Sequence, residues 1–212
     1  MGPHADFVRD ILDTLVVDKL ASDISWDTAR ANGYRGLATA IYCMSRWPGV
    51  AAAPSFTVLE NWLTESDSLD EDLCDNVRET YEIFWALAKD EKLNQVFWLP
   101  GVKNVAPIEF LAISLLIFKH KSHMTMAQLS EAIGLMRHDI RKEEKDIRQN
   151  SRLMKQVLGF VKNLKVSDVK KASGRDSVAG AAISDKKGKK RKRMASDSAA
   201  GKLSSATYSN RF

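Results

Sequence analysis

The sequence has little cysteine, no long hydrophobic run and few segments of strand-like alternation. Two cysteines in 212 residues exclude a disulfide scaffold and are typical of a reducing compartment. The longest apolar stretch, residues 110–118, is much shorter than the roughly 20 residues that a membrane-spanning helix needs. The N-terminus has no basic segment followed by an apolar run, so no signal peptide is expected. We therefore predict a protein without membrane contacts.

Motifs that carry catalysis or hold a cofactor are also missing. There is neither a glycine-rich phosphate loop nor a Gly-x-Ser-x-Gly nucleophile elbow. His120 and His123 lie three residues apart, but a predicted helix end separates them, and no Cys, Asp or Glu joins them at ligand spacing. We assign no catalytic residue, no metal ligand and no cofactor, and we do not expect this chain to be an enzyme.

Charge is distributed unevenly along the chain. Residues 165–212 contain 13 Lys and Arg against 4 Asp and Glu, whereas residues 1–164 contain 19 against 23. All five Trp and seven of the eight Phe lie in the first part. The second part has too few large apolar side chains to offset the entropy lost on ordering. The composition predicts one folded domain, residues 1–164, followed by a disordered basic tail, residues 165–212.

The apolar residues of the first part recur at helical spacing. We expect helices over 4–20, 33–47, 56–64, 69–87, 107–120 and 152–164, and another that begins at 125 and runs into the charged stretch 141–150, with a break at Asn150 and Ser151. The segment 107–120 is apolar nearly all round, which predicts a central buried helix with Leu115 and Leu116 among the most buried residues. The fold class predicted is therefore all-α, with six to eight helices in a single domain.

Three segments have the spacing of a capping box, in which a hydroxyl side chain and an acidic or amide side chain close the first turn of a helix. They are Thr57 with Glu60, Ser68 with Glu71, and Thr125 with Gln128. Pro107 suits the first turn of the helix that it begins, because proline has no amide hydrogen to leave unpaired there.

The strongest local signal is a basic run that has seven cations in eight residues. Such a run on an unfolded tail is typical of a nuclear localisation signal, whose import receptor binds it in extended form. The alternative is a solvated run with non-specific affinity for phosphates. We favour nuclear import, which predicts a nuclear protein and an import receptor as a partner. The residues of the run are Lys186, Lys187, Lys189, Lys190, Arg191, Lys192 and Arg193.

A second basic pattern lies within residues 136–150. Four cations follow one another in steps of three or four residues, as on one face of a helix: Arg137, Arg141, Lys145 and Arg148. A purely basic face would indicate contacts to phosphates or to a partner. Three acids interleave with these cations, however: Asp139, Glu143 and Asp146. Mixed signs favour a solvated face with i,i+4 ion pairs.

The chain resembles a family of fungal proteins that carry a ParB/sulfiredoxin-like domain. The resemblance covers residues 5–163 and rests on the ordered segments NGYRGLATAIYCM, VLENWL, RETYEIFWAL, VAPIEFLAISLLI, MRHDIRKEEKDIRQN and LMKQVLGFV. In that family such a helical region follows a nuclease-type domain with an Asp-Gly-Gln-x-Arg loop, and the bacterial relatives are modification-dependent restriction enzymes. That loop does not occur in this sequence, so the resemblance transfers no catalytic residue.

Two functions follow as expectations. The first is a non-catalytic helical nuclear module that binds a protein or a nucleic acid. The alternative is a fragment of a ParB/sulfiredoxin-like nuclease or nucleotide hydrolase that lacks its catalytic domain. We favour the first, because it needs only the helical domain and the basic tail, whereas the second rests on the resemblance alone.

Overall fold

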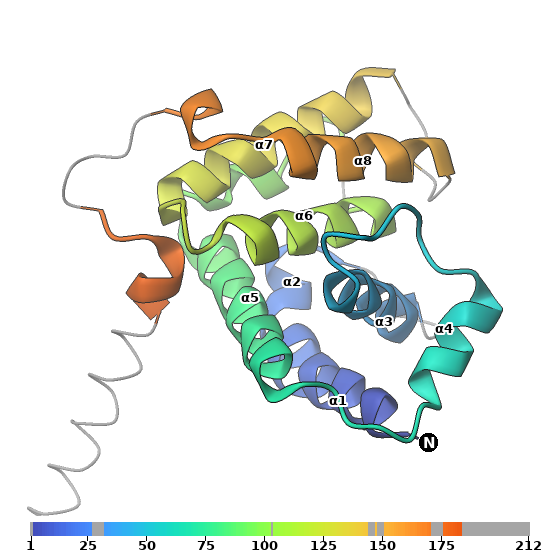
Figure 1. The fold of residues 1–212 in the computed structure, drawn as a ribbon. Helices are drawn as coiled ribbons and strands as arrows, with labels where there is room; N and C mark the ends of the chain where they lie inside the picture. Colours follow the sequence, from blue (N-terminus) through green and yellow to red (C-terminus); the bar gives the residue numbers. More distant parts are fainter. Residues whose placement is uncertain are drawn as a thin grey trace, which may run out of the picture.

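Helix α6 (Pro107–His120) runs through the middle of the computed structural model, and the other helices pack around it (Figure 1). The structure describes residues 2–26, 32–102, 104–143, 147, 151–170 and 176–183. Nearly every side chain of α6 is buried, including Leu115 and Leu116, as the apolar pattern predicted. A helix buried on all sides needs partners on all sides, and this requirement organises the fold.

Two groups of helices cover α6 from opposite sides (Figure 1). On one side lie the N-terminal elements α1 (Pro3–Ile11), the π-helical η1 (Leu12–Leu20), α2 (Ala21–Asp23), α3 (Asn32–Ser45), α4 (Phe56–Leu63) and α5 (Glu71–Lys89). On the other side α7 (Met126–Glu143) and α8 (Ser151–Asn163) lie next to each other, and the short helix η2 (Asn94–Phe97) packs on α7. The helix η3 (Val166–Asp168) follows α8.

The described residues form eight α-helices and no β-strand, which confirms the predicted all-α class. An isolated bridge between Thr125 and Val178 is the one strand-like pairing among them. Aromatic rings fill the centre of the core, where Trp26 stacks on Phe110 with ring centroids 3.8 Å apart. The rings of Tyr81 and Phe84 lie 6.0 and 5.7 Å from the same ring. Phe110 therefore joins α6 to both α5 and the end of the N-terminal segment.

Two of the three expected capping boxes are wrong. Ser55, not Thr57, accepts the hydrogen bond that begins α4, from the amide of Val58. Asp70, not Ser68, accepts the corresponding bond of α5, from the amide of Leu73. In each case another side chain suitable for an N-cap lies two residues from the expected one, and the spacing alone does not decide between them.

The third capping box is confirmed. The amide of Gln128 donates to Thr125 Oγ1 at 3.3 Å, and the amide of Thr125 donates to Gln128 Oε1 at 3.1 Å. Pro107 occupies the first turn of α6, as expected. There Glu109 accepts a hydrogen bond from the amide of Ala106 at 2.9 Å.

The folded part continues beyond Leu164, so the expected domain boundary there is too early. Val169 and Ala179 are buried. The amides of Ala179 and Gly180 donate to Met124 O and Lys121 O, at 2.9 and 3.1 Å, at the C-terminal end of α6. Composition averaged over the tail conceals this short apolar segment, residues 178–183. The expected disorder of residues 171–175 and 184–212 falls outside the described residues.

Gly180 allows this C-terminal segment to come close to α5. A Cβ atom at Gly180 would lie 2.9 Å from Glu79 Oε1, so a side chain there would displace the carboxylate of Glu79. Glu79 itself pairs with the buried Lys121, whose Nζ also donates to Asn76 O at 2.7 Å. The segment therefore covers a buried ion pair between α5 and the end of α6.

Candidate functional site: a groove between α7 and α8

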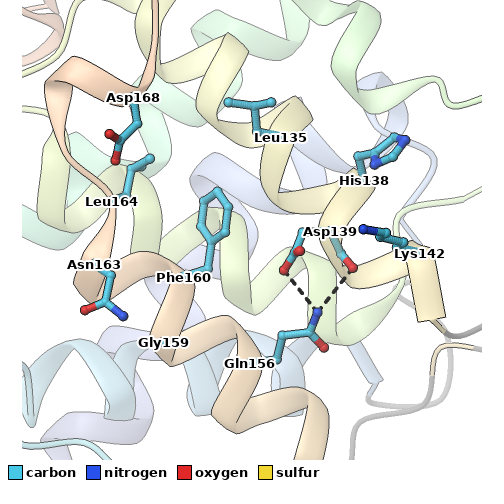
Figure 2. Close-up of a pocket in the computed structure, with 10 residues that line it drawn as sticks. All are labelled: Leu135, His138, Asp139, Lys142, Gln156, Gly159, Phe160, Asn163, Leu164 and Asp168. Atoms are coloured by element: carbon cyan, nitrogen blue, oxygen red, sulfur yellow. Dashed lines mark hydrogen bonds between the residues drawn. The ribbon is translucent and has the colours of Figure 1, made fainter.

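A groove of about 580 Å³ separates α7 from α8 on the surface of the molecule (Figure 2). Four residues of each helix line it, and the chain that follows α8 closes one end. The lining residues are Leu135, His138, Asp139, Lys142, Gln156, Gly159, Phe160, Asn163, Leu164 and Asp168. It is the candidate functional site because apolar side chains are open to solvent between walls of polar and charged ones.

The floor of the groove is apolar and incompletely filled. Leu135 is 44% exposed, and Phe160 projects from α8 toward α7 and is half-buried (Figure 2). Gly159 lies inside α8, and a Cβ atom placed there would meet no atom within 4 Å. Glycine inside a helix costs about 0.5–1 kcal/mol relative to alanine. Since packing does not require it, Gly159 keeps the floor open at the expense of helix stability.

One polar contact ties the two walls together. Gln156 Nε2 donates to both the carbonyl oxygen and Oδ2 of Asp139, at 3.2 and 3.0 Å (Figure 2). This contact occupies the carboxylate of Asp139 from the α8 side. The side chains of His138 and Lys142 remain exposed on the α7 wall. Helix α8 contains no acidic residue, and its Lys155 is exposed one turn before Gly159, whereas Lys162 donates to Val50 O, which is not part of the groove, at 2.9 Å. The exposed charges beside the groove on α7 and α8 are therefore basic, whereas the exposed Asp168 makes the closed end acidic.

A buried ion cluster holds the opposite face of α7. Arg137 is fully buried and donates to both carboxylate oxygens of Glu109, at 3.0 and 3.2 Å, and to Val96 O at 2.6 Å. Arg141 donates to the same two oxygens, both at 2.7 Å. Glu109 is buried as well, so one carboxylate receives four guanidinium bonds inside the fold. This cluster fixes α7 to α6 and η2, and thereby fixes one wall of the groove.

The expected solvated face is wrong for Arg137 and Arg141. Both guanidinium groups bind Glu109, and Arg137 has no exposed surface with which to contact a phosphate or a partner. The helical spacing correctly placed them on one face, but that face is directed inward. Lys145 and Arg148, the other two members of the pattern, lie outside the described residues.

The cluster keeps its carboxylate ionised. Burial alone would raise the pKa of Glu109, but hydrogen bonds from Arg141 and Arg137 outweigh it and hold that pKa below its ordinary value. A protonated Glu109 would lose charge pairing with two cations, one of them fully buried. The negative charge is therefore a structural requirement at this position.

Two basic side chains at the end of α6 position α8. Lys119 Nζ donates to Val161 O and Lys162 O, both at 2.7 Å. His120 Nε2 lies 3.2 Å from Val161 O, and since a carbonyl can only accept, this nitrogen carries the proton. These bonds satisfy carbonyl groups of the last turn of α8, which have no partner within the helix. The second wall of the groove is thus fixed from beneath, as the first is.

Sequence reasoning missed the groove, although two signals pointed to it. Leu135 is an apolar residue outside the apolar stripe of α7 that Leu129, Ile133, Met136 and Ile140 form, and Gly159 is a glycine inside the helical pattern of α8. The seven cations of the basic run, from Lys186 to Arg193, fall outside the described residues.

Within the described ranges, no group of three or more His, Cys, Asp or Glu side chains is placed to hold a metal ion. No helix in the same ranges is both long and apolar enough to cross a membrane. No family model, curated protein or solved structure matches the chain. Functional inference therefore rests on the geometry and charge of the groove.

Proposed function

We propose that the chain is a non-catalytic helical module that binds an acidic amphipathic helix of a partner protein in the α7–α8 groove, and that the basic run at 186–193 directs it to the nucleus. The observation that carries the first part is Gly159, which leaves the floor open beside the exposed Leu135. A site kept open against helix propensity is typical of a surface selected for binding.

The dimensions of the groove suit a helix. Two roughly parallel walls with an apolar floor form the surface into which an amphipathic helix places side chains at positions i, i+3 or i+4, and i+7. From Gln156 to Asn163 the α8 wall spans about 10 Å, or two turns. We expect two or three apolar anchors, with one of them above Gly159 and against Phe160.

The charges of the flanks favour an acidic partner. Lys142 is exposed on α7, Lys155 is exposed one turn before Gly159, and α8 has no acid. Such complementarity raises association rates and excludes basic competitors more than it adds affinity. A nucleic acid would also meet these cations, but it would leave the apolar floor unused.

A peptide-display selection against the purified chain tests the proposal. Libraries of about 16 residues span the groove with one turn to spare at each end. We expect enrichment of peptides with Leu, Phe or Trp at helical spacing and Asp or Glu between them. A selected peptide should bind at least about ten-fold more weakly, or 1.4 kcal/mol, to Gly159→Leu, whose side chain fills the floor.

A second variant tests the floor of the groove, and a matched variant elsewhere on the surface serves as its control. Leu135→Asp should abolish binding, whereas Val17→Asp, on η1 at 47% exposure, should leave it unchanged. Gly159→Ala should raise the free energy of unfolding by about 0.5–1 kcal/mol, which separates folding from binding. Selected peptides that bind the Gly159 and Leu135 variants as well as the wild type would refute the proposal. So would duplex DNA that binds the wild type and loses affinity in Lys142→Ala.

A further inference from the structure

Helix α4 exposes some of its apolar side chains and buries others. Leu59 and Trp62 are buried against the core, as expected for an amphipathic helix. Phe56 and Val58, however, are 63% and 43% exposed, and they lie on different sides of the helix because they are two residues apart. Of the two, Phe56 lines an apolar cavity, so its exposed ring and the cavity together offer an apolar contact to a second molecule.

A cavity of about 460 Å³ adjoins this exposed face. Residues of α1, α3 and α4 line it, and its apolar part is formed by Ala5, Ala38, Leu59 and Leu63. Phe56 lines it as well. The surface therefore offers a projecting apolar side chain directly beside an apolar hollow.

Two opposite charges line the same cavity without neutralising each other. The guanidinium of Arg35 lies 5.8 Å from the centre of the Phe56 ring, and Glu60 lies on the next turn of α4. Within the described part of the chain, neither side chain has an ion-pair partner. An arginine and a glutamate at one apolar site are free to bind groups of opposite sign on an incoming molecule.

We propose that this surface is the two-fold interface of a homodimer. In a two-fold interface, if one residue of the first copy contacts a different residue of the second copy, the same contact occurs again with the two copies exchanged. Phe56 of each copy then enters the hollow of the other, and Arg35 of each copy pairs with Glu60 of the other. A second copy meets every requirement of the surface: a projecting ring, a hollow, one cation and one anion.

The homodimer is independent of the proposed partner helix. The cavity and the α7–α8 groove share no lining residue, so a dimer would present two grooves. Two grooves on one particle would raise the avidity for a multivalent partner without any new contact.

Sedimentation velocity of the full chain over a concentration series tests the interface. We expect wild type at about 100 µM to sediment as twice the chain mass of 23.7 kDa and to dissociate on dilution. Arg35→Glu and Glu60→Arg should each raise the dissociation constant at least about ten-fold, because like charges then face each other twice. The double variant should restore the dimer, since the two-fold axis pairs the exchanged charges again.

Controls distinguish this interface from other association. Phe56→Ala should weaken the dimer. Val17→Asp, which replaces an exposed apolar side chain outside the proposed interface, should not. Circular dichroism of each variant verifies the fold, and both charged side chains are exposed, so the helices should be retained. A wild-type chain that remains monomeric at the highest concentration overturns the proposal. A dimer that survives both single reversals, or is not restored by the double variant, overturns it as well.

Discussion

Arg137 and Glu109 are both fully buried, and the guanidinium of the first donates to both carboxylate oxygens of the second. The two residues lie 28 positions apart, on α7 and α6, and Arg141 completes the cluster from the next turn of α7. Their ion pair joins the buried central helix to the wall of the groove. Any shift of α7 relative to α6 would separate charges that are largely buried.

Removing Arg137 should therefore be costly. Breaking a buried ion pair by deleting one partner costs about 3–5 kcal/mol, because it leaves an uncompensated charge inside the protein. We expect Arg137→Ala to lower the free energy of unfolding in urea by this amount, although Arg141 will compensate in part. Lys142→Ala, on the exposed side of the same helix, should change it by less than about 0.5 kcal/mol. A loss below about 1 kcal/mol for Arg137→Ala would show that water reaches the cluster.

The contrast between Leu116 and Glu109 shows what the sequence could predict. Apolar residues on nearly every side of the segment 107–120 predicted a buried helix. Leu115 and Leu116 of this helix have no exposed surface. Glu109 lies in the same helix and is equally buried, but its burial depends on two arginines far away in sequence. Local spacing identified the arginines as one face of a helix. It could not determine whether that face meets solvent or a distant carboxylate.

The groove illustrates a second limit. A glycine within a helix can reflect close packing, a bend or an open site, and only the surroundings distinguish these cases. At Gly134 a Cβ atom would lie 3.1 Å from a methyl group of Val96, so close packing explains that glycine. At Gly159 nothing lies nearby. The sequence of each helix is similar around its glycine, and the difference arises entirely from tertiary structure.

Truncation should locate the end of the folded part. Cutting after Leu164 removes the buried Val169 and Ala179 and the amides that bond to the end of α6. We expect a loss of about 2 kcal/mol from this burial and hydrogen bonding. For a chain of this size, such a loss lowers Tm by about 4–8 °C. Cutting after Ile183 should leave Tm unchanged in thermal circular dichroism. Equal Tm values for the two truncations would contradict the packing of Val169 and Ala179 against the fold.

The basic run should direct the chain to the nucleus. Replacement of residues 189–193 by alanine removes five of its seven cations, and an import receptor that binds them in extended form would lose most of its contacts. A fluorescent fusion too large for passive diffusion should be nuclear in wild type and cytoplasmic in the variant. If both forms distribute alike, the run is not an import signal. DNA retention that falls with salt and is lost in the variant would instead identify a phosphate-binding arm.

Protonation of His120 should destabilise the attachment of α8. Burial lowers the pKa of His120 below its ordinary 6.5, with only partial opposition from its hydrogen bond to Val161 O. A histidine with a lowered pKa in the folded state binds fewer protons there than in the unfolded chain. Its stabilising contribution is therefore fully present above pH 6.5 and is lost as pH falls through the folded pKa.

Urea unfolding at pH 7.5, 6.5 and 5.5 measures this effect, which cannot exceed about 1.4 kcal/mol per pH unit for one group. His120→Gln retains a donor for Val161 O but does not titrate, so its stability should vary less over the same range. Glu109 does not interfere, because its pKa lies below its ordinary 4.5 and its contribution is lost only at lower pH. An identical pH dependence in wild type and His120→Gln would show that His120 is not the group that titrates. If the dependence is weaker in the variant, acid loosens the wall of the groove that α8 forms, and peptide affinity should fall with it.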